Sequence, residues 1–160
     1  MKRRFRLAVV AAGALTLMLL VAAACVPVPP NVAPAAAPAA MSANTITGIV
    51  WQWLSVTDQT TRQTTTVPNP ASYTIIFNVN GTVTGKADCN SFTGTWSQQN
   101  GFHIQVVPNV MAACGTLDSQ YLTLLNQVAA GGPDGAGNLA LETAGGAQRM
   151  LFKNGGPAPK

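Results

Sequence analysis

The chain has 160 residues, which corresponds to one domain of ordinary size. Its nine Lys and Arg residues exceed its five Asp and Glu residues, but four of the nine lie within the first six positions, so the rest of the chain carries five of each sign. A protein that binds nucleic acid needs clustered basic side chains in its folded part to displace counterions from phosphates. The remaining basic residues are scattered, so the sequence predicts no nucleic-acid partner.

The N-terminal segment has the order of a secretory signal. A basic head with Lys2 and Arg3 precedes an uncharged apolar run over residues 7–24, which ends in small side chains before Cys25. The run also reaches the lower length limit of a membrane-spanning helix, so a retained single-pass anchor is the alternative. Both interpretations bring the chain to a membrane.

Residues 21–25, Val-Ala-Ala-Ala-Cys, resemble the lipobox of bacterial lipoproteins. In that family the Cys thiol receives a diacylglycerol group, the chain is cut just before it, and the new amino terminus is acylated, commonly with palmitate. The resemblance implies a signal peptide over residues 1–24 and a lipid anchor at Cys25. Several acyl chains hold a protein firmly in a membrane, whereas one chain does not.

The segment that follows Cys25 predicts a tether. Residues 26–44 are mostly Pro and Ala and carry no charge, a composition that favours extended polyproline geometry over packing. No acidic residue follows Cys25 directly, and in Gram-negative lipoproteins this is typical of the outer membrane. We therefore expect residues 25–44 to link an extracytoplasmic membrane surface to a domain over residues 45–156, with a short tail at 157–160.

Two cysteines remain for the domain, Cys89 and Cys114. Export places them in an oxidising compartment, where paired thiols usually form a disulfide. A reactive thiol would need a nearby cation or helix N-terminus, whereas Cys89 has Asp88 beside it. A zinc site would need about four ligands, and the chain has one His. The sequence therefore favours a Cys89–Cys114 disulfide and predicts no metal and no cofactor.

The first half of the domain has the pattern of strands and turns. Residues 45–56 are rich in β-branched and aromatic residues and predict a strand, and the polar residues 57–71 predict a long loop. Apolar residues alternate over 73–79 and point Val79 to the core side. Asn80-Gly81 predicts a hairpin turn with two left-handed residues, and residues 82–87 form the return strand.

A second hairpin is expected from residues 92–97 and 102–107, joined by Asn100-Gly101. Phe102, Ile104 and Val106 share one face of the second strand, so His103 and Gln105 share the other. This parity points the one histidine of the chain to solvent. It predicts neither a catalytic triad nor a metal role for His103.

One stretch has helical periodicity, residues 115–129. Its apolar positions form a single face that packs against the sheet: Leu117, Tyr121, Leu124, Leu125 and Val128. Thr116 is the expected N-cap, and Asp118 in the first turn suits the helix dipole. A helix lying on a membrane surface is the alternative, but the polar face carries no Lys or Arg. Residues 130–137 predict a flexible loop, and residues 138–143 and 148–153 predict the last strands.

These elements predict a mainly β fold: a small antiparallel barrel of about seven strands with one helix before the last two.

The chain also resembles the META domain family, which includes the HslJ-like envelope lipoproteins. The resemblance covers residues 46–153 and depends on Trp53-Leu54, on Cys114 after Met111, and above all on residues 89–96, Cys-Asn-Ser-Phe-Thr-Gly-Thr-Trp. The chain departs from the family pattern in having two alanines before Cys114 and in having Trp96 where Tyr is usual. The resemblance implies a lipocalin-like barrel in the cell envelope, linked to stress tolerance, and brings no catalytic residues.

The Cys-Asn-x-Phe-x-Gly block also has a structural interpretation. Gly85 and Gly94 permit close approach of backbones, Asn90 bonds to nearby backbone in a turn, and Phe92 and Trp96 fill the interior. The alternative is that the block contacts a ligand. The candidate binding residues are then Trp53, Asn90, Phe92, Gly94 and Trp96.

The expected function is that of a non-enzymatic envelope module that binds a partner protein, a glycan or a hydrophobic small molecule, the last two within a lipocalin-like barrel. A hydrolase or redox enzyme is the first alternative, and a structural spacer is the second. Hydrolysis needs a base near a nucleophile or a pair of carboxylates. The acidic residues of the domain lie mostly in loops and do not converge in sequence, so no catalytic residue is predicted.

Overall fold

A computed structural model of the chain describes residues 46–109, 112 and 114–160. The predicted signal peptide, Cys25 and the tether lie outside the described residues. No helix among the described residues has the length and apolar character needed to cross a bilayer.

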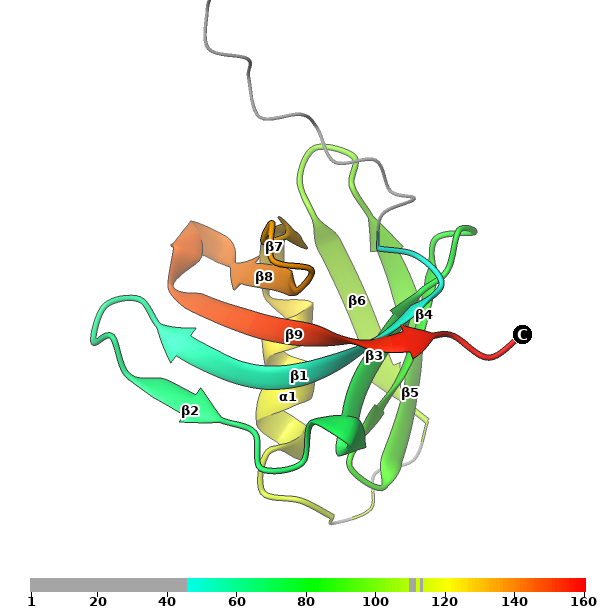
Figure 1. The fold of residues 1–160 in the computed structure, drawn as a ribbon, viewed down its shortest axis with the longest axis horizontal. Coiled ribbons are helices and arrows are strands. Elements are labelled where there is room, and N and C mark those ends of the chain that lie inside the picture. Colours follow the sequence, from blue (N-terminus) through cyan, green and yellow to red (C-terminus); the bar gives the residue numbers. More distant parts are fainter. Residues whose placement is uncertain (1–45, 110–111, 113) are drawn as a thin grey trace, which may run out of the picture. The chain divides into compact units, whose positions relative to one another are not determined.

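The described residues form nine strands and one α-helix (Figure 1). The strands are β1 (Ile49–Asp58), β2 (Thr64–Thr66), β3 (Tyr73–Phe77), β4 (Thr82–Ala87), β5 (Asn90–Ser97), β6 (His103–Pro108), β7 (Val128–Pro133), β8 (Leu139–Thr143) and β9 (Gln148–Pro157), and the helix is α1 (Asp118–Asn126). The main path of the sheet is antiparallel, with the order β6-β5-β4-β3-β1-β9-β8-β7, and β2 pairs with β1. The predicted mainly β fold is confirmed, with two more strands than expected, and α1 precedes three strands instead of the predicted two.

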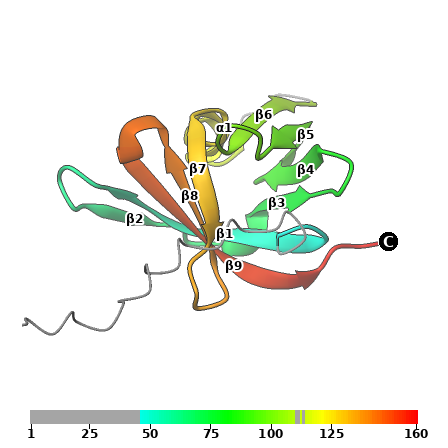
Figure 2. The same ribbon diagram turned by 90° about the horizontal axis from the view of Figure 1, so that it is seen from above.

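The sheet is curled, and α1 lies beside its two end strands, β6 and β7 (Figure 2). These strands form no continuous ladder with each other. One backbone bond joins the region, from the Phe102 N–H to the Ala129 carbonyl at 3.0 Å. The sheet is thus a partial barrel with a seam between β6 and β7.

The interior of the curl is packed with aromatic side chains. Trp53, Phe77 and Tyr121 are fully buried, and the Trp53 and Tyr121 rings stack with centroids 4.9 Å apart. Strand alternation supplies this core because every second residue of a strand faces the same side. The expected inward positions of Phe92 and Trp96 are confirmed, since both are buried.

Two strands occur where the sequence predicted loops. β2 lies in the expected loop 57–71, and all three of its residues are exposed, so no apolar alternation marks it. β7 lies in the expected helix end and loop, over a sequence rich in Ala and Gly. A Cβ on Gly131 of β7 would meet the Leu141 side chain of β8, so close packing explains the small residue there.

The first hairpin turn and the helix start also differ from expectation. Gly81 has a positive φ of 81° while Asn80 does not, so the turn is not the predicted pair of left-handed residues. Val79 lies within the turn, in which the Gly81 N–H donates to the Asn78 carbonyl at 3.1 Å, and it is 85% exposed instead of facing the core. The N-cap of α1 is Leu117, which makes no side-chain cap bond, so the prediction for Thr116 was wrong.

Candidate functional site

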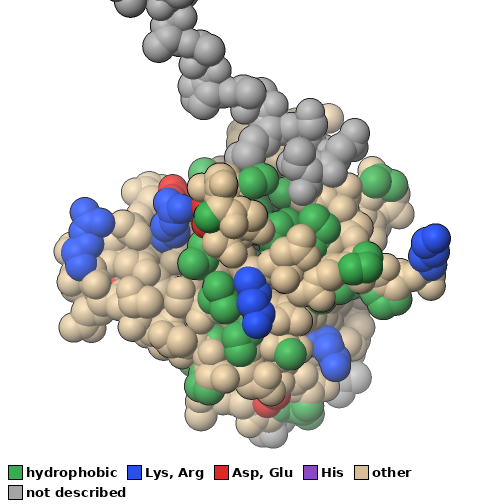
Figure 3. Space-filling model, in the orientation of Figure 1, with side chains coloured by type: hydrophobic (Ala, Val, Ile, Leu, Met, Phe, Trp, Pro, Cys, Tyr) green, Lys and Arg blue, Asp and Glu red, His purple; other side chains and the backbone are tan. Residues whose placement is uncertain are grey.

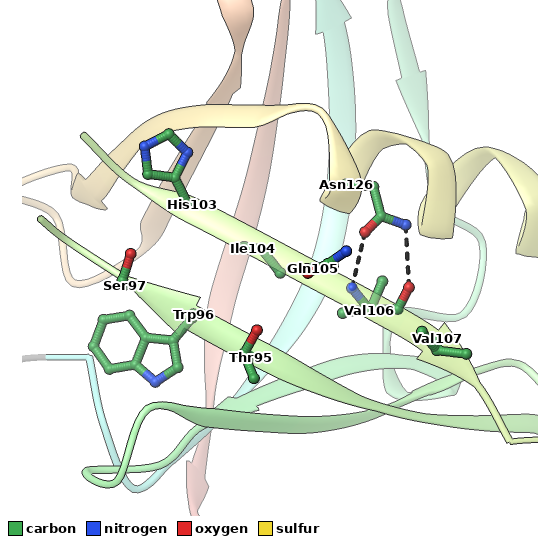
Figure 4. A pocket seen from close by; sticks show the side chains of 9 residues that line it. All are labelled: Thr95, Trp96, Ser97, His103, Ile104, Gln105, Val106, Val107 and Asn126. Atoms are coloured by element: carbon green, nitrogen blue, oxygen red, sulfur yellow. Dashed lines mark hydrogen bonds between the residues drawn. The ribbon is translucent and has the colours of Figure 1, made fainter. Parts of the chain in front are cut away.

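The outer face of β5 and β6 carries a hollow of about 680 Å³ next to the end of α1 (Figure 4). Its polar lining side chains include neither a carboxylate nor a Lys or Arg. They are Thr95, Ser97, His103, Gln105 and Asn126.

Strand register brings these side chains together. Thr95 lies opposite Gln105, and Ser97 lies opposite His103. Their neighbours Trp96 and Ile104 point to the core, so the polar residues share the outward face. The outward position predicted for His103 and Gln105 is confirmed.

Asn126 closes one end of the hollow and also holds the seam of the sheet. Its Oδ1 accepts a hydrogen bond from the Val106 N–H at 2.8 Å, and its Nδ2 donates to the Val106 carbonyl at 3.3 Å. The side-chain amide therefore occupies the place of the next strand's peptide group at the edge of β6 (Figure 4). No sequence pattern indicates this role, because the partner is twenty residues away and on another kind of element.

A second polar cluster surrounds the disulfide. Cys89 and Cys114 are bonded, with Cα atoms 5.8 Å apart. Asn90, buried at the start of β5, donates from Nδ2 to the Ala112 carbonyl at 3.0 Å and accepts at Oδ1 from the Ala112 N–H at 2.9 Å. Asn90 thus fixes the loop that carries Cys114, a longer-range role than the local turn bond expected from sequence.

Asp118 is the buried acid of this cluster. Its carboxylate accepts hydrogen bonds from the Tyr73 hydroxyl at 3.0 Å, from Asn90 Nδ2 at 3.3 Å and from the Gly115 N–H at 3.2 Å. Burial, followed by the bond to Asp118 and the negative charges of Asp118 and Asp88, raises the pKa of Tyr73 to about 12. The cluster joins β3, β5 and α1 through a carboxylate whose bonds are made within the protein.

The other motif residues lie in the core. Trp53 has an exposed fraction of 0%, and its Nε1 donates to the Ser55 carbonyl at 2.9 Å. Phe92 is buried, and a Cβ on Gly94 would meet the backbone carbonyl of Gln105, as the predicted close approach requires. Trp96 alone of this group lines the hollow, and its Nε1 donates to the Asn78 carbonyl at 2.9 Å. The structure therefore does not gather the five candidate binding residues into one site.

Two surface carboxylates, Asp58 and Asp134, stabilise loops by accepting hydrogen bonds from backbone N–H groups of the same loop. Backbone N–H groups of Thr60 and Thr61 bond Asp58, and the bond from Thr61 lowers the pKa of that carboxyl. Asp134 is bonded in the same way, and the Asn138 side chain lowers its pKa. Within the described ranges no group of three or more His, Cys, Asp or Glu side chains is arranged to hold a metal ion.

Lys and Arg side chains are spread singly over the face that bears β1 and β9 (Figure 3). Arg149 of β9 forms an ion pair with Glu142 of β8 at 3.1 Å. The described residues of the pictured face show no basic cluster of the kind that binds phosphates.

The curled antiparallel sheet, the single described helix and the Cys-Asn block tied to a second Cys define a small disulfide-linked β domain. The chain belongs to the META domain family, whose model matches residues 44–155. No curated protein matches the chain.

Two solved structures share the fold. A DUF4847 family protein from Bacteroides vulgatus is 15% identical, with a TM-score of 0.53, over 68% of this chain and 93% of that one. A protein from Burkholderia xenovorans, solved by NMR, is 16% identical, with a TM-score of 0.55, over 81% of this chain and 98% of that one. At these identities the likeness concerns the fold alone.

Proposed function

We propose that the chain is a lipid-anchored, non-enzymatic binding module of the bacterial cell envelope that contributes to envelope stress tolerance. The lipobox-like residues 21–25 and the Pro/Ala-rich residues 26–44 support the anchor and its tether, at the outer membrane in a Gram-negative cell. The Cys89–Cys114 disulfide supports export, because such bonds persist mainly in oxidising compartments. The stress role is an implication of the META family.

The observation that carries the binding role is the hollow on β5 and β6. Thr95, Ser97, His103 and Gln105 line it, and no hydrogen bond within the described part of the chain engages their side chains. A few polar groups converging on a concave surface are typical of binding sites. The aromatic packing of the interior favours this outer surface over the alternative of a hydrophobic ligand inside a lipocalin-like barrel.

The non-enzymatic proposal rests on how the titratable groups are used. Asp118 accepts three internal hydrogen bonds, and Asp58 and Asp134 close loops. A hydrolase remains the second candidate because Ser97 and His103 are directly opposite each other, a nucleophile type beside a base type. Among the described residues no bond joins these two side chains, and no carboxylate bonds to His103 to orient it.

Two measurements test the proposal. Intact mass of protein extracted from membranes without reductant is expected to show acylation at Cys25 and the loss of two hydrogens for one disulfide. A photo-crosslinking amino acid at Gln105 is expected to capture an envelope component in living cells, while the same group at Thr65 on β2 does not. Unacylated protein in the cytosol would contradict the anchor, and equal capture at both positions would contradict the binding surface.

A separate assay decides between binding and hydrolysis. If the full-length protein hydrolysed an activated ester, and Ser97→Ala and His103→Ala each abolished the turnover, the hydrolase would replace the binding module as the preferred function.

A further inference from the structure

The outward face of β4, β5 and β6 has an unusual composition. Every outward position of β5 carries a hydroxyl, and all four are exposed: Ser91, Thr93, Thr95 and Ser97. On β4, Thr84 lies opposite Thr93 and Thr82 lies opposite Thr95. We call these six residues the hydroxyl face. It continues into the hollow through Gln105 and His103 of β6.

We propose that the ligand of the hollow is a neutral saccharide chain that lies along the hydroxyl face. This inference rests on the proposed binding function and names its ligand class. Thr84, Thr95, Ser97 and Gln105 form no side-chain hydrogen bond with the described residues, so their donors and acceptors are available to a ligand. Sugar hydroxyls are themselves paired donors and acceptors and can bond to such groups in either direction.

Charge on the same face argues against ionic ligands. The outward residues of β4, β5 and β6 include one cation, Lys86, at the far end from Ser97, and no carboxylate. A phosphorylated or sulfated polymer would require clustered Lys and Arg, and a cationic ligand would require acids. Apart from His103 and the exposed Val107 of β6, the surface around the hollow consists of hydroxyl and amide groups, and it is complementary to an uncharged ligand.

The edge of β6 argues against an added peptide strand. Strand addition needs free backbone groups along an edge. At the edge of β6 that faces away from β5, the N–H and carbonyl of Val106 are bonded to Asn126, and the Phe102 N–H is bonded to the Ala129 carbonyl. A peptide would have to displace these bonds, whereas a saccharide on the outward face leaves them intact.

Strand geometry suits a linear ligand. Side chains two residues apart on one strand repeat at about 6.6–6.8 Å, and neighbouring strands are about 4.7–4.9 Å apart. Ser97, Thr95 and Thr93 follow one another along β5, so their hydroxyls form a row next to the hollow, and of these three only Thr93 is hydrogen-bonded within the described structure, to Asn109 at 3.3 Å. A chain of sugar rings can contact several members of this row at once.

Full-length lipidated protein in a polyoxyethylene detergent is the material for the test, because sugar-based detergents would compete. Maltohexaose, cellohexaose and the N-acetylglucosamine hexamer are titrated, with heparin as the anionic comparison, and calorimetry reports binding, supported by the fluorescence of the three tryptophans. We expect at least one neutral hexasaccharide to bind. The double variant Thr95→Val/Ser97→Ala should bind it about tenfold more weakly, as the loss of two hydrogen bonds predicts.

The control is Thr65→Val, an exposed threonine on β2 that lies outside the hydroxyl face, and it should bind like the unaltered protein. Three results would overturn the inference: no binding of any neutral hexasaccharide at millimolar concentration, tighter binding of heparin, or full binding by the double variant. If the crosslinker at Gln105 captured a protein while no saccharide bound, the ligand class would be wrong and the binding function would stand.

Discussion

Two buried tyrosines illustrate how one hydroxyl can be essential and another dispensable. Tyr73 donates to Asp118, whereas the Tyr121 hydroxyl is buried and has no hydrogen-bond partner among the described residues. Removing a donor from a buried carboxylate leaves an acceptor unsatisfied, and removing an unpartnered hydroxyl leaves nothing unsatisfied.

We therefore expect Tyr73→Phe to lower the free energy of unfolding by about 1–3 kcal/mol at neutral pH. The matched change Tyr121→Phe should leave it unchanged or raise it. Urea unfolding followed by Trp fluorescence measures both values. Equal losses in the two variants would show that the bond to Asp118 contributes nothing.

The same pair predicts how stability depends on pH. The pKa of Tyr73 in the folded protein is raised to about 12 from an ordinary value of 10.0, so folding favours the neutral phenol. This contribution is complete below pH 10 and is lost as the pH rises toward 12. Burial also raises the pKa of Tyr121, which adds to the loss. Unfolding curves between pH 9 and pH 12 should fall less steeply for Tyr73→Phe than for the unaltered chain, and parallel curves would contradict this.

Asn126 gives a prediction for the seam of the sheet. Asn126→Ala removes both bonds to Val106 and should destabilise the domain by about 1–2 kcal/mol, because water replaces them in part. Gln127→Ala changes the next exposed residue, whose side chain forms no hydrogen bond within the described structure, and should have little effect. The urea unfolding midpoints of the two variants provide the comparison. Identical midpoints would show that the bonds between Asn126 and Val106 do not stabilise the domain.

At the scale of elements, sequence predicted most of the strands that bury alternate residues. β3 and β6 followed from apolar alternation, as did the outward direction of His103, whereas β4 and β5 followed from the two Asn-Gly turns of the predicted hairpins. β2 and β7 were missed because their pairing uses backbone bonds and close packing, neither of which leaves an apolar pattern. The strand expected to reach Val79 ends at Phe77 because the chain turns there.

The hollow was missed for a related reason. Thr95, Ser97 and Gln105 look like ordinary solvent-facing positions in sequence. They line a concave surface only because the register of β5 and β6 places them side by side and because Asn126, at the end of α1, lies next to them. The disulfide and the Phe92 and Trp96 positions could be predicted, since cysteine pairing and strand parity are readable from sequence.

The pairing of β5 with β6 depends on Gly94. A Cβ there would meet the Gln105 carbonyl, so Gly94→Ala must separate the strands and should cost about 1–3 kcal/mol. Ser97→Ala on the same strand changes an exposed side chain and should cost less than about 0.5 kcal/mol. Thermal unfolding of both variants tests this, and similar melting temperatures would show that the strands tolerate the added methyl group.

For the whole molecule, the disulfide ties the β4–β5 turn to the loop before α1. The two cysteines are separated by 25 residues, and closing a loop of that length stabilises a protein by roughly 3 kcal/mol in the chain-entropy model. The double variant Cys89→Ala/Cys114→Ala should lose about that amount yet remain folded, because Asn90 still holds Ala112. Guanidinium unfolding gives the value, and added reductant should then have no effect on the variant. A midpoint equal to that of the oxidised protein would rule out the stabilising role.

The position of β1 has a mechanical consequence. β1 is the first strand of the domain and also a central one, with β3 and β2 on one side and β9 on the other. A pull along the axis of β1, applied to the chain before Ile46 and opposed by the rest of the sheet, therefore loads the ladders on both flanks of β1 in shear instead of peeling an edge strand away. Forced rupture is governed by the rate of unfolding, so a domain hung from this end should resist tension better than one hung from β7.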